Sequence, residues 1–188
     1  MIIWRFTDGK LGHENQTAGL VSALRAIQGD VTVIDIPVCT LPTSGTLLFR
    51  AFFRKKIVQF PPEKPDLIIG AGHKTHIPMV VAKSQCGGKN VVLMRPSIPM
   101  GLFDLVVAPK HDNVSLRGNV IETRGALNDV QFVEHKDMDL GLMLIGGASP
   151  HYSWDDVGIA NQIKQITDQE PDVEWTLTTS RRTPEKLL

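Results

Sequence analysis

The feature that most constrains the fold of this chain is the alternation of short apolar runs with longer amphipathic segments. A strand followed by a helix, repeated along a chain, is typical of a parallel sheet, because each parallel connection needs a crossover. The apolar and helical periodicities predict strands over residues 2–6, 31–36, 67–69, 90–94, 104–108 and 119–122, and helices over 14–28, 47–58 and 74–84. We therefore expect an α/β fold with a doubly wound, Rossmann-like parallel sheet.

A second pattern of the same kind begins at the apolar run 140–145. The helix that follows this run is expected to be capped by Ser153. The sequence ends about five residues into a further helix, too few to recover the cost of helix nucleation. We therefore predict one Rossmann-like domain over residues 1–138 and the incomplete, truncated start of a second over 139–188, and we expect this chain to be inactive alone.

The composition indicates a globular protein, with 42% hydrophobic residues and 20 basic against 20 acidic residues. No apolar run approaches the roughly 20 residues that span a bilayer, and the first residues lack the pattern of a secretory signal. Cys39 and Cys86 are far apart and match neither a disulfide framework nor a thiolate metal site. These features favour a reducing, cytoplasmic location.

The charge is unevenly distributed, which bears on the partners of this chain. Residues 1–120 hold 14 basic and 8 acidic residues, and residues 121–188 hold the remaining 6 basic and 12 acidic. The first part either faces an anionic partner or has a solvated basic surface. Residues 47–58 mix three phenylalanines with four cations, which fits either peripheral contact with the membrane or a core helix with a basic outer face. No nucleic-acid-binding signature is present, so we expect no nucleic-acid partner.

Polar residues and glycines follow the first predicted strand. Asp8, Lys10, Gly12 and His13 stand immediately before a predicted helix, where free backbone N–H groups favour an anion. A histidine changes its charge near neutral pH, which suits His13 for general-base catalysis. The alternative is a glycine-rich turn with a solvent-facing histidine.

The segment 70–76, GAGHKTH, follows the third predicted strand. It matches neither the Walker A pattern nor the dinucleotide-binding fingerprint. His73 and His76 have the spacing of a shared helix face, but no nearby carboxylate or cysteine completes a metal site, so none is expected. Gly70 and Gly72 indicate either a helix start that faces a phosphate or sugar, or a simple helix cap.

Two further loops carry candidate anion ligands. Arg95 follows the fourth predicted strand, and its guanidinium suits bidentate recognition of phosphate or carboxylate. Gly146, Gly147 and Ser149 follow the first strand of the second domain, where small residues let a diphosphate approach the backbone. Arg181 lies in a polar segment after the next strand. The alternative for Arg95 is an ordinary surface arginine. The alternative for the segment that holds Arg181 is a polar strand-to-helix connection.

Together, these motifs resemble the mitochondrial-fission Elm-type family over nearly the whole chain. The segments that carry the resemblance are DGK and GHENQ in 8–16, GAGHKTH in 70–76, PKHD in 109–112, GALN in 125–128, IGGAS in 145–149 with HYSW in 151–154, and TTSRRTP in 178–184. The resemblance implies a transferase with two Rossmann-like domains, of the glycosyltransferase B type, longer than this chain. It also implies a nucleotide-sugar donor, a cell-envelope glycan or glycolipid acceptor, and no cofactor or metal.

A looser similarity relates the glycine loops to those of the lipid-linked N-acetylglucosaminyl transferase of peptidoglycan synthesis. It implies that His13 is the catalytic base or an acceptor-side residue, that Gly146, Gly147 and Ser149 contact the donor diphosphate, and that Arg181 neutralises its charge. The acceptor-side residues would then be Asp8, Lys10, Gly12, Gly70, Gly72, His73 and Arg95. Two alternatives stay open: a non-catalytic scaffold that binds a nucleotide or a partner, and a dehydrogenase-like enzyme, which the absent dinucleotide fingerprint disfavours.

Overall fold

The computed structural model describes residues 1–43, 45–46, 59–130, 133–149, 153–180 and 182–185. The chain divides into two compact units, Met1–Gln131 and Phe132–Leu188, and each is described by itself. The basic and aromatic helix predicted over 47–58 lies outside the described residues. None of the helices that the structure does describe is both long and apolar enough to span a membrane.

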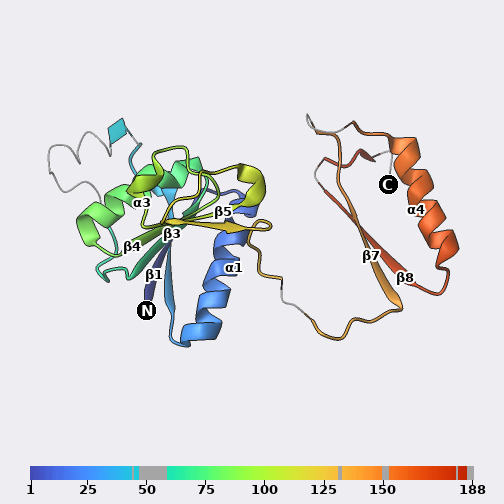
Figure 1. Cartoon of the computed structure of the whole chain (residues 1–188), viewed down its shortest axis with the longest axis horizontal. Coiled ribbons are helices and arrows are strands. Elements are labelled where there is room, and N and C mark those ends of the chain that lie inside the picture. The colour runs from blue at the N-terminus through green and yellow to red at the C-terminus, as the bar shows by residue number, and fades with distance from the viewer. Residues whose placement is uncertain (44, 47–58, 131–132, 150–152, 181, 186–188) are drawn as a thin grey trace. The chain divides into compact units, whose positions relative to one another are not determined.

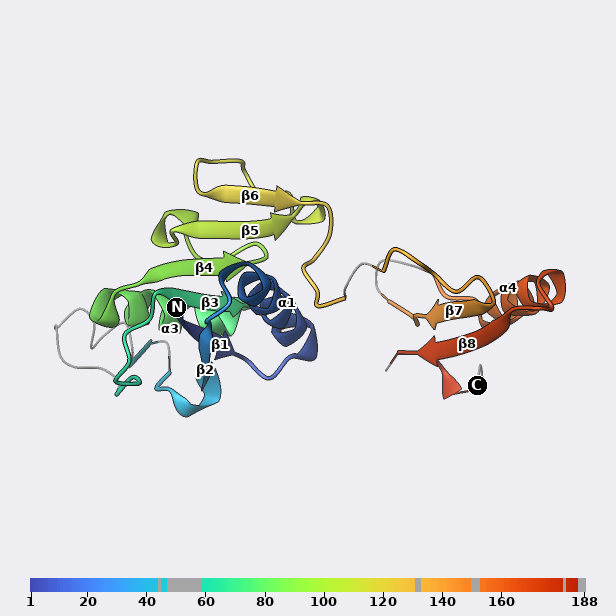
Figure 2. The same cartoon turned by 90° about the horizontal axis from the view of Figure 1, so that it is seen from below.

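The first unit contains a six-stranded sheet in which all neighbouring strands are parallel, in the order β2-β1-β3-β4-β5-β6 (Figure 2). The strands are β1 (Ile2–Thr7), β2 (Thr32–Pro37), β3 (Leu67–Ala71), β4 (Lys89–Leu93), β5 (Leu105–Pro109) and β6 (Val120–Thr123). The strand order reverses at β1, since β2 lies on one side of it and β3 to β6 follow on the other. The predicted α/β fold with a Rossmann-like parallel sheet is confirmed.

Helices α1 (Leu11–Gln28) and α3 (His73–Cys86) cover opposite faces of this sheet (Figure 1). Successive strand residues point to opposite faces, so strands β1 to β5 each contribute to both hydrophobic clusters. The cluster under α3 includes Trp4, Phe6, Ile68, Met79 and Val92, and the cluster under α1 includes Ile3, Val21, Ile69, Val91 and Leu93. Burial on both faces explains why these strands are continuous apolar runs in the sequence. Single 3-10 turns lie at Val38–Thr40, Met100–Leu102 and Lys110–Asp112.

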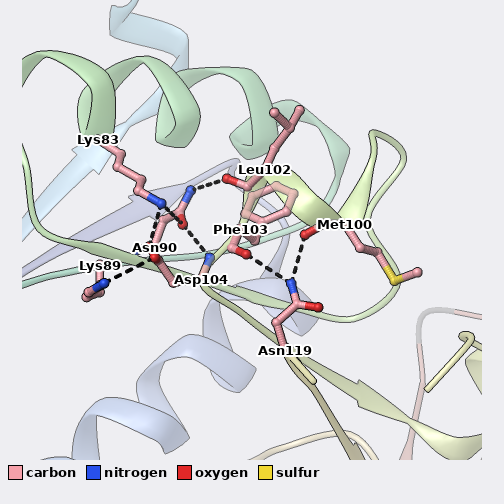
Figure 3. Close-up of polar contacts among 8 residues, drawn as sticks. All are labelled: Lys83, Lys89, Asn90, Met100, Leu102, Phe103, Asp104 and Asn119. Atoms are coloured by element: carbon pink, nitrogen blue, oxygen red, sulfur yellow. Dashed lines mark hydrogen bonds and ion pairs between the residues drawn. The ribbon is translucent and has the colours of Figure 1, made fainter. Parts of the chain in front are cut away.

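A buried polar network fixes the connection between β4 and β5 at the amino end of the sheet (Figure 3). The fully buried Asn90 donates from Nδ2 to the carbonyl of Leu102 at 3.0 Å, and its Oδ1 accepts the backbone N–H of Asp104 at 2.8 Å. The Asp104 carboxylate accepts the backbone N–H of Asn90 at 2.9 Å and pairs with Lys83 Nζ at 2.7 Å. Burial raises the pKa of Asp104, but the hydrogen bonds from Lys83 and Asn90 and the nearby ammonium charges lower it below its ordinary value.

The second unit has one β-α-β arrangement, with parallel strands that pair from Leu140↔Glu174 to Ile145↔Thr179. Its elements are β7 (Leu140–Ile145), α4 (Asp156–Gln169) and β8 (Glu174–Thr179). The cap of α4 is Asp155, whose carboxylate accepts the N–H of Val157, and the expectation of a Ser153 cap is wrong. Aspartate and serine are equally good caps, so their order in the sequence did not decide between them.

Candidate functional site

The strand-order reversal defines where a ligand is expected in this fold. In open parallel sheets, ligands bind beyond the carboxyl ends of the strands, at the point where the order reverses. In the first unit this point lies between β1 and β3. The segments that follow these two strands are residues 8–13 and 70–76, the first two loops identified from the sequence.

The first of these segments contains a histidine paired with a buried carboxylate. His13 Nδ1 lies 2.9 Å from Asp8 Oδ2, and the Asp8 side chain is only 1% exposed. Because a carboxylate can only accept, Nδ1 carries the proton in the neutral ring, which leaves Nε2 as the acceptor nitrogen. The Asp8 carboxylate is held by the backbone N–H of Lys10, which donates to Oδ1 at 3.2 Å. An oriented histidine of this kind is suited to take a proton from a substrate.

His13 lies in the first turn of α1, because this helix starts at Leu11 and not at residue 14 as the periodicity predicted. Within the described residues, the amides of Leu11 and Gly12 have no hydrogen-bond partner, and no side chain caps this helix. Lys10 is exposed next to them. Glu14, which accepts the N–H of Gly9 at 3.1 Å, adds a negative charge in the same turn. The helix start thus offers amide donors and one cation to an anion, opposed by two carboxylates, Asp8 and Glu14.

The second segment packs directly on this histidine-carboxylate pair. Gly72 has φ +86°, and a Cβ added there would collide with His13 Nδ1 and lie 2.8 Å from Asp8 Oδ2. Both its conformation and the lack of space therefore require glycine at this position. Gly70 has a different role, since a Cβ there would meet Met79 Sδ at 2.5 Å and prevent α3 from packing on β3. The structure thus places Asp8, His13 and Gly72 together, as expected if they form one site.

The two histidines at the start of α3 do not share a surface. His73 is exposed, whereas His76 is 1% exposed and packs edge-on against Phe103. Burial, with the charges of His73 and His13, lowers the pKa of His76 to about 4, so its ring is neutral at pH 7. Its Nδ1 accepts the backbone N–H of Ser97 at 3.3 Å. No group of three possible metal ligands occurs among the described residues.

The loop after β4 contacts α1 through one hydrogen bond that the sequence did not indicate. Met94 has φ +69°, a conformation that is uncommon for a non-glycine residue and that clusters at functional sites. The buried Gln16 of α1 donates from Nε2 to the Met94 sulfur at 3.3 Å. The next residue, the predicted anion ligand Arg95, is exposed, and its backbone N–H donates to Asp112 Oδ2 at 2.9 Å.

In the second unit, the loops after β7 and β8 lie together. Thr183 Oγ1 is 2.5 Å from the carbonyl oxygen of Gly146 and 3.1 Å from that of Ile145. A Cβ on Gly147 would collide with the backbone of Arg182, so glycine is required for this close packing. Arg181 lies outside the described residues.

The start of α4 is unfavourable for an anion. Two carboxylates stand there: Asp155 caps the helix, and Asp156 accepts the indole N–H of Trp154 at 2.6 Å. Both oppose an anion at this helix start. A diphosphate bound near Gly146, Gly147 and Ser149 would therefore depend on the backbone of the glycine loop and not on the helix dipole.

A comparison with protein families matches residues 11–188 to the family described as Mitochondrial fission ELM1. The chain belongs to this family. A further comparison finds similarity to the Uncharacterized protein RP120 of Rickettsia prowazekii (strain Madrid E), with 27% identity over 115 residues. The match covers 60% of this chain and 32% of the relative, so the chain spans about a third of the length of that curated relative.

Proposed function

We propose that this protein of the Mitochondrial fission ELM1 family transfers a sugar from a nucleotide-sugar donor to a cell-envelope glycan or glycolipid acceptor, on the cytoplasmic side of the membrane. The observation that carries the proposal is the His13–Asp8 pair, packed against Gly72 at the strand-order reversal. A group-transfer enzyme needs an oriented base at such a position, whereas a pure binding module does not.

In this proposal, His13 Nε2 takes the proton of the attacking acceptor hydroxyl. The acceptor oxygen forms the new bond to the anomeric carbon, and the bond from that carbon to the donor phosphate breaks. The nucleoside diphosphate leaves with the electron pair. Asp8 stabilises the imidazolium that forms on His13 and keeps its ring oriented, which makes Asp8 a positioning residue.

The acceptor is proposed to bind in the first unit and the donor in the second. The exposed ammonium of Lys10 and the two free amides at the start of α1 suit the polar groups of an acceptor. The glycine loop at Gly146 and Gly147 suits the donor diphosphate, because backbone amides need no side chain to reach it. Arg181 is proposed to neutralise the leaving group, without a bound metal.

Because this chain is expected to be inactive alone, the test uses a longer form of the protein with a complete second Rossmann-like domain. It measures release of nucleoside diphosphate from a panel of UDP-, GDP- and ADP-sugars in the presence of an envelope glycolipid extract. We expect release with at least one donor and a loss of about 10²–10⁴-fold in His13→Ala. Asp8→Asn is expected to lower the rate as well, since the ring is then held in the wrong tautomer. His135→Ala, which changes an exposed histidine of the second unit, is the matched control and is expected to keep the wild-type rate.

Two results would contradict the proposal. Full activity in a folded His13→Ala protein would remove the assigned base. Absence of release with every donor, combined with a rise in melting temperature on addition of a nucleoside diphosphate, would instead support a scaffold that binds nucleotides without turnover.

A further inference from the structure

A pocket on the first unit is lined by residues of the segment that connects β4 to β5 and of the segment that connects β5 to β6. Its volume is about 240 Å³, which is below the usual 300–1,000 Å³ of sites for drug-sized ligands. Arg95 belongs to the first segment, and Ser115 and Arg117 belong to the second, shortly before β6. The pocket therefore suits a small molecule or a single headgroup.

The lining of this pocket is strongly cationic. Its lining residues include Arg95 and Arg117 and no aspartate or glutamate. Across the described part of the chain, neither guanidinium has an acidic partner within 4.0 Å, whereas Arg5 pairs with Asp35. Arg95 Nη1 instead lies 3.5 Å from the backbone carbonyl of Asp112. Two arginines thus line one small pocket without an acidic partner among the described residues, and their charge favours an anion there.

The carboxylate of Asp112, next to the lining residue Asn113, already has other partners. Asp112 Oδ2 accepts the backbone N–H of Arg95 at 2.9 Å, and its Oδ1 lies 3.7 Å from His111 Nε2. It holds the two connecting segments together through main-chain hydrogen bonding and leaves the Arg95 guanidinium available.

The walls of the pocket are held in place before any ligand arrives. Asn119 Nδ2 donates to the carbonyls of Met100 and Phe103, each at 3.0 Å, which ties the first wall to the start of β6 (Figure 3). Two prolines, Pro96 and Pro99, restrict the backbone of the same wall. A rigid site loses little conformational entropy on binding, which favours affinity for a small ligand.

The side chains present fit a phosphate group attached to a less polar body. A guanidinium forms paired, parallel hydrogen bonds to phosphate oxygens, and two of them match the double charge of a phosphomonoester. The Ser115 hydroxyl can donate a further hydrogen bond. Ile98 and Val114 give the pocket an apolar part that a free inorganic ion would not use.

We propose that this pocket binds the phosphomonoester group of a small ligand, either a sugar phosphate or the headgroup of a phosphomonoester lipid. The lining residues of the pocket include none of residues 8–13 or 70–76, and the proposal does not depend on the transfer reaction. Arg95 and Arg117 supply the charge, and Ser115 supplies a neutral donor.

The test is isothermal titration of the whole chain with glucose 1-phosphate, inorganic phosphate and unphosphorylated glucose. We expect glucose 1-phosphate to bind, phosphate to bind more weakly and glucose not to bind. Arg117→Ala is expected to weaken binding of glucose 1-phosphate at least 10-fold, and Arg117→Lys to weaken it less, because charge remains but the planar fork is lost. Arg124→Ala changes an exposed arginine that does not line the pocket, and it is the matched control.

A second arm of the experiment separates the two sources of the phosphate. Cosedimentation with phosphatidic acid vesicles, compared with phosphatidylcholine vesicles, that is lost in Arg117→Ala and kept in Arg124→Ala would support a lipid headgroup. Binding of glucose 1-phosphate alone would support a soluble ligand. The proposal is overturned if neither phosphomonoester binds, if glucose binds as well as its phosphate, or if Arg124→Ala is as damaging as Arg117→Ala.

Discussion

The buried His76 predicts how the stability of this protein depends on pH. Its pKa is about 4 in the folded chain, against an ordinary value of 6.5, because the ring is buried near other histidines. Between these two values the unfolded chain binds more protons than the folded one, so the free energy of unfolding falls as the pH is lowered. Protonation would also place a proton on Nδ1, which accepts the backbone N–H of Ser97.

The magnitude follows from the two pKa values. At pH 5 the unfolded histidine is almost fully protonated and the folded one mostly is not, a difference equivalent to roughly 1.5 pKa units. With an allowance for solvent screening, the expected loss of stability between pH 8 and pH 5 is about 1–2 kcal/mol. The carboxyl of Asp104, whose pKa is lowered, loses its contribution only at still lower pH.

Urea unfolding followed by circular dichroism at pH 8 and pH 5 measures this loss. In His76→Asn, the amide oxygen can still accept the Ser97 N–H but does not titrate, so the pH-dependent difference should shrink by about 1–2 kcal/mol. His111→Asn alters a histidine whose side chain is 67% exposed and should keep the wild-type difference. If the wild type and His76→Asn lose the same free energy over this range, then burial of His76 is not the cause.

Two other predictions concern the packing of the first unit. Gly72→Ala should lower the free energy of unfolding by about 1–3 kcal/mol, because it combines a strained backbone with a collision; in Gly12→Ala the added Cβ meets no atom within 4 Å, and helix propensity should raise stability by roughly 0.5–1 kcal/mol. Equal effects of the two alanines in thermal unfolding would contradict this account. Asn90→Ala should cost about 2–4 kcal/mol, since it leaves a buried carbonyl and a buried N–H unpaired. Lys89→Ala removes only an exposed ion pair with Asp104, at 3.5 Å, and should change stability by less than about 0.5 kcal/mol. A similar loss in both variants would show that the hydrogen bonds of the buried Asn90 are not the main contribution.

The strands of the first unit were predictable because parallel strands buried on both faces are apolar throughout. Each strand predicted over residues 1–122 is present, with ends that differ by a few residues. The start of α1 was predicted three residues too late, at residue 14 instead of Leu11. The residue before the helix, Lys10, has no side chain that can cap it, and helical periodicity is weak over a single turn. The cap of α4 was misassigned because Ser153, Asp155 and Asp156 are all competent caps within four residues.

The candidate site was only partly predictable from the sequence. Asp8 and His13 are close in the chain, but their hydrogen bond depends on a helix start that the pattern missed. The contact of Gly72 with this pair follows from strand order, which a single sequence does not specify. Arg117 was not identified from the sequence, because an isolated arginine forms no recognisable motif. It lines the same pocket as Arg95 because β4, β5 and β6 are neighbours in the sheet.

The polar network around Asn90 and the pair formed by His13 and Asp8 lie at opposite ends of the same sheet. Mutations that improve stability often damage activity when both depend on the same residues. The two groups of residues share no direct contact, so the effects on stability of changes at one end should add to those of changes at the other. Stabilising substitutions at the amino end of the sheet are therefore expected to leave the His13–Asp8 pair, the base of the proposed reaction, undisturbed.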